Sequence, residues 1–400
     1  MKKITALFFA LLLALTCFTG CGNKEETLVL NVYNWGEYIS DGSEGSLNVN
    51  EEFEKYYYNA FGQRVKVNYT TYASNEDMYN KLSSGAVSYD VIIPSDYMIA
   101  RMIKEDMLLK LDFENIPNYK YIDQQYKNAY YDPKSEYSVP YFCGYVGIIY
   151  NTDMVEGEIC DWDCLWNEEY RGKILQFNNP RDAFGTALYY KGYDVNTLNK
   201  EEWNEAKDLL KGQKPYVQSY VMDEIFNKMK NGSAAIAPYY VGDFLAMYED
   251  NDKLAVIYPK SQTNIFVDAM CVPKCAKNKS LAEAYINFCL TEQISVANAE
   301  MVYYASPNIL VKDNEEYIEY MTEVHPDAIE ILYPEGGINA SYYENLSPEM
   351  LGYMNSLWEE LKIENSVGAW VYIFAGGIII VLLAFAVINE IRKKINSRYY

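Results

Sequence analysis

Residues 28–39, LVLNVYNWGEYI, combine the two kinds of side chain that bind organic cations. The segment begins with alternating apolar residues, which predicts a β-strand. It ends in Trp35, Gly36, Glu37 and Tyr38, where the glycine breaks the pattern. Ligands of open α/β sheets bind outside the carboxyl ends of strands. At such a position the aromatic rings would contact the methylenes of an organic cation, and the carboxylate would bind its ammonium group. A surface loop that holds one aromatic residue is the alternative.

The elements that would position this loop alternate along the chain. Short apolar runs predict strands, and capped segments with apolar residues at helical spacing predict helices. The strands are expected at 64–69, 89–94, 147–150 and 173–177, and the helices at 75–84, 202–210, 221–230, 281–290 and 350–361. This alternation predicts an α/β fold with a largely parallel sheet. A body of roughly 340 residues exceeds one hydrophobic core, so two domains are expected.

The N-terminus has the pattern of a targeting signal. Lys2 and Lys3 precede the apolar run 4–17, and the small residues before Cys21 are similar to a bacterial lipoprotein signal. Residues 1–20 are therefore expected to be a signal peptide, with Cys21 as the lipidated N-terminus. An uncleaved signal anchor is the alternative.

The C-terminus carries a second membrane signal. Residues 367–388 contain no charged side chain and are long enough to span a bilayer as one helix. Basic residues follow in 389–400, which predicts a cytoplasmic tail. The body between the two signals would then face the outside of the cell, anchored to the membrane.

The charge of the chain narrows the classes of ligand. The formal net charge is −22, and the basic tail makes the remainder more negative still. Such a field repels nucleic acid and attracts cations, although a generic acidic surface kept soluble by its charge is the alternative.

The cysteine spacing leaves the state of the thiols open. Of eight cysteines, six lie in the body, and Cys160/Cys164 and Cys271/Cys275 share one spacing. A disulfide or a four-cysteine zinc site is conceivable, but the spacing differs from the common zinc pattern. We therefore expect free or partly paired structural thiols, with no metal and no cofactor.

Six segments in order along the chain resemble one family. They are YNWGEYI, TTYASNEDMYNKL, YDVIIPSDYM, YSVPYFCGYVGIIYN, IFVDAMCVPKCAKN and YYASPN. Together they resemble the substrate-binding proteins of spermidine/putrescine ABC transporters, bacterial extracellular solute-binding proteins with the type II periplasmic-binding fold. The resemblance runs from about residue 28 to residue 361.

The resemblance implies two α/β lobes joined by hinge strands, with the ligand between them. The N-lobe would comprise 27–140 and 268–308, and the C-lobe 141–267 and 309–364. Crossing strands would lie near 139–143 and 267–273.

The resemblance also implies a set of ligand-binding residues, carried over where the motifs match. They are Trp35, Gly36, Glu37, Tyr38, Ser95, Tyr97, Asn179, Asp182, Tyr239, Phe266, Asp268, Tyr304 and Glu344. Asn179 stands where the family commonly has an acid, and Tyr239 and Phe266 stand where spermidine binders often have tryptophan. These departures leave open which polyamine is preferred.

The function implied is that of a polyamine receptor for an ABC importer, which hands spermidine, putrescine or both to a permease with its cytoplasmic ATPase. A receptor for another organic cation is the alternative. An enzyme, such as a membrane-anchored carbohydrate-active one, is less well supported, because the sequence has one histidine, no nucleophile elbow and no phosphate loop. A tethered adhesion or scaffold protein is a further alternative.

Overall fold

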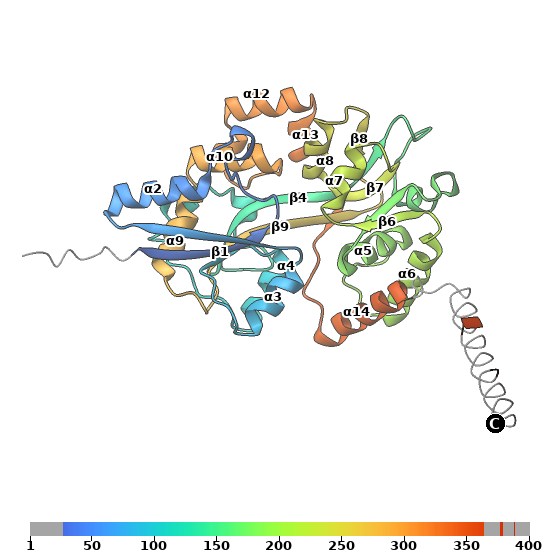
Figure 1. Cartoon of the computed structure of the whole chain (residues 1–400), viewed down its shortest axis with the longest axis horizontal. Helices are drawn as coiled ribbons and strands as arrows, with labels where there is room; N and C mark the ends of the chain where they lie inside the picture. The colour runs from blue at the N-terminus through green and yellow to red at the C-terminus, as the bar shows by residue number, and fades with distance from the viewer. Residues whose placement is uncertain (1–26, 364–376, 379–387, 389–400) are drawn as a thin grey trace, which may run out of the picture. The chain divides into compact units, whose positions relative to one another are not determined.

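A computed structural model describes residues 27–363, 377–378 and 388 of the chain. The chain divides into two compact units (Figure 1). Among the described residues, unit 1 comprises 27–143 and Val267–Tyr320, and unit 2 comprises Gly144–Phe266 and 321–363. The chain therefore passes from one unit to the other three times.

The third passage lies later than the predicted end of the N-lobe at residue 308. It falls within α12 (Glu315–Val324), after the short helix α11 (Ile309–Lys312). The hydroxyl groups of Tyr303 and Tyr320 lie 3.0 Å apart within unit 1, a contact that joins residue 320 to this unit.

Unit 1 is built on a parallel sheet. β1 (Leu28–Trp35) pairs in parallel with β2 (Val65–Tyr72) on one side and with β3 (Val91–Ile92) on the other. In β9 (Thr263–Cys271), Cys271 pairs with Ile92 in the antiparallel direction, so the strand returns beside β3. β4 (Ser138–Asn151) begins in this unit, where Cys143 forms an antiparallel bridge with Ala305.

Helices cover the sheet of unit 1. The α-helices that lie wholly in the unit are α2 (Val49–Phe61), α3 (Asn75–Ser83), α4 (Asp96–Lys104), α9 (Lys279–Cys289), α10 (Glu292–Val302) and α11. α2 begins where the side chain of Asn48 accepts a hydrogen bond from the Glu51 amide, and it ends at Gly62 in the left-handed conformation. Phe53 of α2 packs edge to face against Tyr285 of α9, and this contact forms part of the interface between the two helices.

Unit 2 has a mixed sheet. β5 (Ile174–Phe177) pairs in parallel with β6 (Val217–Val221) and β7 (Ile236–Tyr240). The second part of β4 runs antiparallel to β7 and to β8 (Leu254–Ile257), and β10 (Ala340–Ser341) pairs with the start of β9. The carboxyl ends of β5, β6 and β7 therefore lie at one edge of this sheet.

Helix α5 (Pro180–Lys191) is the central helix of unit 2. Every residue from Arg181 to Tyr189 is buried, because α6 (Lys200–Gln213) and α14 (Pro348–Ile363) pack beside it (Figure 1). The remaining α-helices of the unit are α7 (Glu224–Lys230), α8 (Val241–Tyr248) and α13 (Ala328–Leu332).

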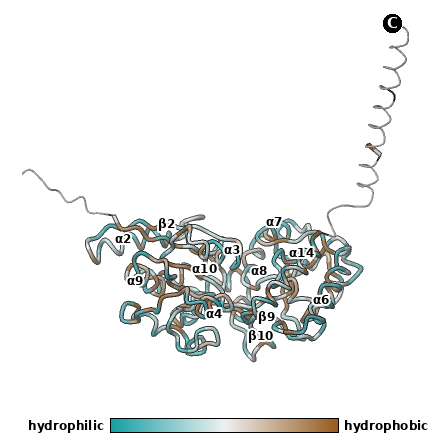
Figure 2. Tube along the Cα trace, turned by 90° about the horizontal axis from the view of Figure 1, so that it is seen from below, coloured by the Kyte–Doolittle hydropathy of each residue, from teal (hydrophilic) through white to brown (hydrophobic). Residues whose placement is uncertain are grey.

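Both units have hydrophobic interiors. Figure 2 shows hydrophobic stretches of the trace inside each unit and hydrophilic stretches along its surface. β5 is buried along its whole length. In β2, Val65 and Val67 are buried and the residue between them is exposed. The α/β alternation predicted from the sequence is confirmed, and each strand and helix predicted between residues 28 and 361 overlaps an observed one.

The predicted membrane signals lie outside the described residues. This holds for residues 1–20, Cys21 and 389–400, and for 367–388 apart from residues 377, 378 and 388. Within the described part of the chain, no helix has both the length and the apolar character needed to cross a bilayer.

The cysteines of the described residues form no disulfide. All six are free, and Cys143, Cys164, Cys271 and Cys289 are buried. Over residues 27–363, no group of three or more histidine, cysteine or acidic side chains is arranged to hold a metal ion.

Candidate functional site

Asp268 is a buried carboxylate in unit 1, on strand β9, with 4% of its surface exposed. Its Oδ1 accepts a hydrogen bond from Ser95 Oγ at 2.6 Å, and its Oδ2 accepts one from the Tyr38 hydroxyl at 2.6 Å. Burial raises the pKa of Asp268 to about 6, although both hydrogen bonds favour the ionised form. Within the described residues Asp268 makes no ion pair. We call Tyr38, Ser95, Asp96 and Asp268 the Asp268 cluster.

Aromatic rings border the Asp268 cluster. The ring of Tyr38 meets Tyr141, Phe142 and Tyr304 edge to face, with centroids 5.9, 5.3 and 5.4 Å away. The predicted residues Tyr38, Ser95, Asp268 and Tyr304 thus lie in one neighbourhood of unit 1. A carboxylate among aromatic rings is an arrangement that binds an ammonium group and its methylenes.

The first predicted loop is fixed by its own hydrogen bonds. Asn34 donates from its side chain to the Tyr38 carbonyl at 3.2 Å, which closes the turn. The half-buried Trp35 donates from Nε1 to the Ile93 carbonyl at 2.9 Å, and its ring packs against Tyr72. Glu37 is exposed and has a φ of 49°, so the backbone adopts the left-handed conformation immediately after Gly36.

Asn75 connects the next two predicted residues. This buried side chain donates to Ser95 Oγ and to the Tyr97 hydroxyl, each at 3.0 Å, and accepts from the Ser95 amide at 3.1 Å. The Tyr97 hydroxyl in turn donates to Glu76 at 3.1 Å. Ser95 and Tyr97 are therefore held by α3, at whose first turn Asn75 lies.

Asp182 is a buried carboxylate of unit 2, in the first turn of α5. Its Oδ2 accepts hydrogen bonds from the Asn179 side chain and from the Tyr240 hydroxyl, the latter at 2.8 Å. Tyr343 also hydrogen-bonds its side chain. Burial raises the pKa of Asp182 above its usual range, while these hydrogen bonds and the neighbouring Arg181 lower it in part. We call Asn179, Arg181, Asp182, Tyr240 and Tyr343 the Asp182 cluster.

Arg181 brings a positive charge into the Asp182 cluster. It is 6% exposed, and its Nη2 donates to Asn196 Oδ1 at 2.7 Å and to the Glu344 carbonyl at 3.2 Å. Its guanidinium carbon lies 4.6 Å from the centre of the Tyr343 ring. Nη1 is buried and has no hydrogen-bond partner among the described residues.

The other predicted residues of unit 2 lie in three different settings. Tyr239 is 2% exposed and stacks on Phe177, whereas Tyr240 reaches Asp182. Phe266 meets the Tyr240 ring at 5.4 Å, and Gly144 leaves room for it, since a Cβ there would lie 3.0 Å from the Phe266 ring. Glu344 is exposed and contacts Arg181 through its carbonyl.

Five residues of the two clusters and their support were not predicted: Asn75, Asp96, Arg181, Tyr240 and Tyr343. Strand alternation is a signal for Tyr240, because it is the last residue of β7 and points opposite to Tyr239. No sequence signal marks Tyr343, which reaches α5 from a segment far along the chain.

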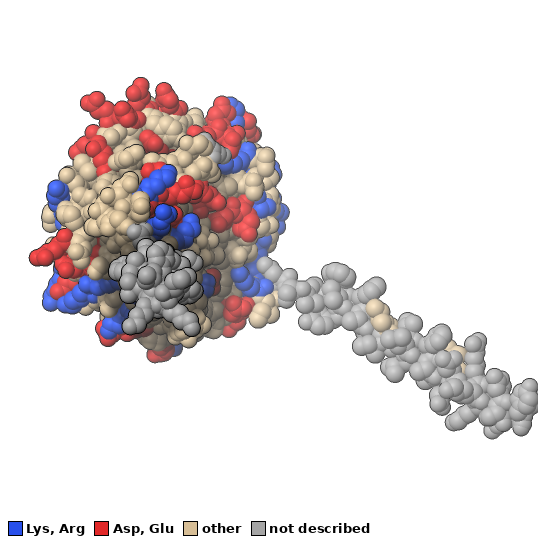
Figure 3. Space-filling model, turned by 60° about the vertical axis from the view of Figure 1, so that its left-hand side comes forward, with Lys and Arg blue, Asp and Glu red and all other residues tan. Residues whose placement is uncertain are grey.

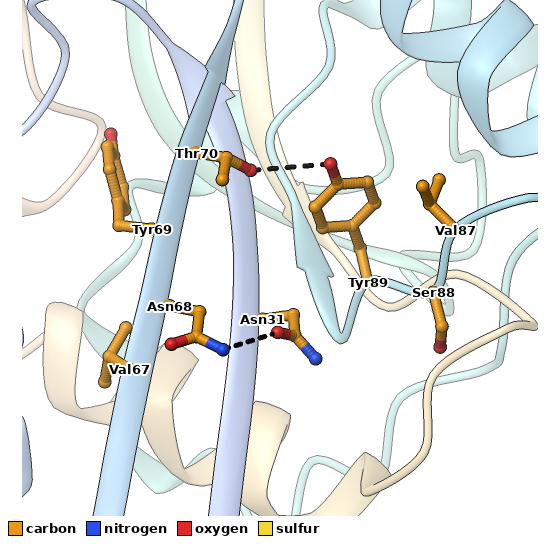
Figure 4. Close-up of a pocket in the computed structure, with 8 residues that line it drawn as sticks. All are labelled: Asn31, Val67, Asn68, Tyr69, Thr70, Val87, Ser88 and Tyr89. Atoms are coloured by element: carbon orange, nitrogen blue, oxygen red, sulfur yellow. Dashed lines mark hydrogen bonds between the residues drawn. The ribbon is translucent and has the colours of Figure 1, made fainter.

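A separate depression of about 680 Å³ lies on unit 1. It is lined by Asn31, Val67, Asn68, Tyr69, Thr70, Val87, Ser88 and Tyr89 (Figure 4). The Asn68 side chain donates a hydrogen bond to Asn31 Oδ1 at 3.1 Å, and the Thr70 hydroxyl donates one to the Tyr89 hydroxyl at 3.5 Å. None of the predicted ligand-binding residues lines this depression.

The surface charge is mixed on the face shown in Figure 3. Aspartate and glutamate lie there among lysine and arginine, without forming one continuous block. A net negative charge of this kind attracts cations weakly over distance.

Comparisons with known proteins identify the family of the chain. The profile of a family described as bacterial extracellular solute-binding protein matches residues 49–322. The spermidine/putrescine-binding periplasmic protein of Salmonella typhimurium is 32% identical over 303 residues, 75% of this chain and 83% of that protein. The putrescine-binding periplasmic protein SpuD of Pseudomonas aeruginosa is 30% identical, over 77% of this chain and 86% of SpuD.

Solved structures show the same fold. A putative spermidine/putrescine ABC transporter protein from Listeria monocytogenes has a TM-score of 0.76 and 34% identity, covering 85% of this chain and all of that one. The substrate-binding protein PotD from Streptococcus pneumoniae has a TM-score of 0.68 and 32% identity, covering 84% and 99%. The fold is thus that of periplasmic binding proteins, and the chain is a binding protein and not an enzyme. It belongs to the bacterial extracellular solute-binding protein family.

Proposed function

We propose that this chain binds a polyamine, spermidine or putrescine, outside the cytoplasm and delivers it to the permease of an ABC importer. The observation that carries this proposal is the Asp268 carboxylate, which is buried, hydrogen-bonded to two hydroxyls and bordered by aromatic rings. The names of the relatives in Salmonella typhimurium and Pseudomonas aeruginosa support the choice of ligand.

The physical reason is the cost of a buried charge. An ionised carboxylate removed from water is unfavourable unless a cation or several hydrogen bonds compensate it. Two hydroxyl donors compensate Asp268 in part, and an ammonium group would complete its coordination. Each ring that contacts the cation or its methylenes adds roughly 0.5–2 kcal/mol. The protein does not alter the amine chemically.

The remaining predicted residues are part of the proposal. We assign ligand contacts in unit 1 to Trp35, Gly36, Glu37, Tyr38, Ser95, Tyr97, Asp268 and Tyr304. In unit 2 we assign them to Asn179, Asp182, Tyr239, Phe266 and Glu344, and we add Tyr240 because its hydroxyl binds Asp182.

Titration calorimetry of the purified protein with putrescine, spermidine and spermine tests the proposal. We expect saturable binding of at least one of them with one site per chain, and no binding of an uncharged diol of matching length. Thermal protection by the same amines is the second measurement. If no amine binds or protects the protein at millimolar concentration, the proposed function is wrong.

The proposal includes two membrane attachments, a lipid on Cys21 and a helix over residues 367–388. It rests on the sequence alone, since these residues lie outside the described part of the chain. Mass spectrometry of the mature N-terminus and carbonate extraction of membranes test it separately. We expect a lipid-modified Cys21, and a Cys21→Ala variant that stays in the membrane through the second attachment.

A further inference from the structure

The end of helix α2 exposes aromatic rings at one end of unit 1. Phe61, the last residue of α2, is 60% exposed and packs on the ring of Tyr57, with the two ring centroids 4.6 Å apart. Tyr58 is 44% exposed, and the guanidinium carbon of Arg64 lies 5.2 Å from the centre of its ring. We call Tyr57, Tyr58, Phe61 and Arg64 the α2-end patch. Neighbouring aromatic side chains that stay exposed together are typical of a surface that binds a partner.

The α2-end patch lies in a basic segment of an acidic chain. Residues 55–66 contain Lys55, Arg64 and Lys66 and no acidic residue, although the whole chain has a formal net charge of −22. Both lysines pair with glutamates of α2, and both are largely exposed. Ion pairs this exposed contribute little, so the ammonium groups can turn to an outside anion. Tyrosine, phenylalanine and basic side chains together favour the interface of a phospholipid bilayer.

The chain enters unit 1 beside this patch. The amide of Leu28, the first residue of β1, donates to the Arg64 carbonyl at 2.9 Å. Leu28 also pairs with Val65 in the parallel register, and Figure 1 shows the start of β1 beside the end of α2. Only residues 22–27 separate Leu28 from Cys21, the predicted site of the lipid. A lipid on Cys21 would therefore hold the patch within about 25 Å of the bilayer surface.

We infer that the α2-end patch rests on the outer surface of the phospholipid bilayer and is kept there by the lipid on Cys21. This inference rests on the proposed function, of which that lipid is a part. The bilayer is the occupant because the short linker gives the patch an effective concentration at the membrane that is roughly millimolar. At such a concentration, even the weak contact of a few rings and cations is populated.

This contact would leave the candidate amine site open. β1 runs from Leu28 at the patch to Trp35, roughly 23 Å away at the carboxyl end of the strand. Ser95 follows β3 and lies at the same edge of the sheet, because β1 and β3 are parallel. When unit 1 rests on the α2-end patch, Trp35 and Ser95 are therefore at the end of its sheet that points away from the lipid.

Quenching of tryptophan fluorescence by brominated lipids tests this contact. The variant Phe61→Trp of the full chain places an indole in the patch. The control Asp77→Trp places one at an exposed position of α3, whose first turn holds Asn75 against Ser95. Both are reconstituted in vesicles of equal parts phosphatidylcholine and phosphatidylglycerol, with and without bromine on the acyl chains. The unchanged protein gives the signal of the native tryptophans, which is subtracted.

We expect brominated vesicles to reduce the added fluorescence of Phe61→Trp by roughly twofold or more, and that of Asp77→Trp by less than roughly 1.2-fold. No quenching of Phe61→Trp, or equal quenching of both variants, would overturn the inference. Docking of the patch on a second copy of the chain would overturn it as well. In that case the Phe61→Trp emission shifts to the blue without quenching, and the shift grows with the ratio of protein to lipid.

A second measurement covers the case in which Phe61→Trp does not fold. Hydrogen exchange of the unchanged protein is compared in the same vesicles and in an amphipathic polymer that contains no phospholipid. We expect the amides in the last turn of α2 to exchange roughly threefold more slowly in vesicles, and those of α3 to exchange equally in both. Equal exchange of α2 would contradict the inference. A mature N-terminus without lipid refutes the proposed attachment, whereas a lipid-modified protein without these signals refutes the docking alone.

Discussion

Two buried carboxylates, Asp268 of unit 1 and Asp182 of unit 2, differ in the charge of their neighbours. Asp182 directly follows the buried Arg181, whereas among the described residues no basic side chain acts on Asp268. Both carboxylates accept hydrogen bonds from tyrosine hydroxyls, Tyr38 in one case and Tyr240 in the other. Their hydrogen bonding is thus similar, and of the two only Asp182 has a cation beside it.

The difference in neighbouring charge indicates which carboxylate would bind a cation more strongly. The charge of Asp182 is offset by a guanidinium group that stays protonated at all accessible pH values. The charge of Asp268 has no such partner among the described residues, so an ammonium group gains more there. We therefore expect amine affinity to depend on Asp268 more than on Asp182.

The largest expected effect is that of Asp268→Asn. Loss of a hydrogen-bonded charge partner of a buried cation costs roughly 2–5 kcal/mol, which weakens binding at least about 30-fold. Titration calorimetry with putrescine measures the change, and Asp77→Asn, at the exposed position of α3, is the control. An unchanged dissociation constant in a folded Asp268→Asn variant would break the comparison between the two carboxylates.

A smaller effect is expected for Asp182→Asn. Because Arg181 already offsets the charge of Asp182, we expect amine binding to weaken by roughly 3–10-fold, or 0.7–1.4 kcal/mol. The matched control is Asp208→Asn, an exposed position in α6 of the same unit. A loss as large as that of Asp268→Asn, measured by the same titration, would show that Arg181 does not weaken this carboxylate.

The smallest effect on binding is expected for Gly185→Ala. A Cβ at this position of α5 would lie 2.2 Å from the Tyr343 hydroxyl, so the tyrosine must move away from Asp182. We expect a loss of about 1–3 kcal/mol in stability, seen as a lower Tm, and a change in amine affinity below that of Asp182→Asn. Gly212→Ala, where nothing lies within 4 Å of the added carbon, should keep or raise the Tm.

Local patterns predict most of the fold. Alternating and helical periodicities locate strands and helices where an element buries one face, as β2 and α2 do. Helix N-caps can be predicted in the same way, as the pair Asn179-Pro180 at the start of α5 shows. The position at which the chain passes between the units for the third time cannot be predicted from local sequence, because it depends on tertiary contacts such as that between Tyr303 and Tyr320.

The candidate site is predicted less completely for a physical reason. A residue that follows a strand end, such as Ser95 after β3, is marked by its position. Residues that support the site through long-range hydrogen bonds, such as Asn75 and Tyr343, carry no local mark. The choice between Tyr239 and Tyr240 depends on which face of β7 is covered, and this is decided by packing on Phe177.

The carbonyl of Ile93 has a consequence for the rigidity of the Trp35 side chain. It accepts hydrogen bonds from both Trp35 Nε1, at 2.9 Å, and the Tyr72 hydroxyl, at 2.6 Å. The hydrogen bond and the contact with the Tyr72 ring therefore hold the indole within the folded unit. Immobilising such a side chain during association costs about 0.5–1.5 kcal/mol, and here folding has already met that entropic cost. If Trp35 contacts the amine as proposed, ordering of its side chain does not reduce its contribution to affinity.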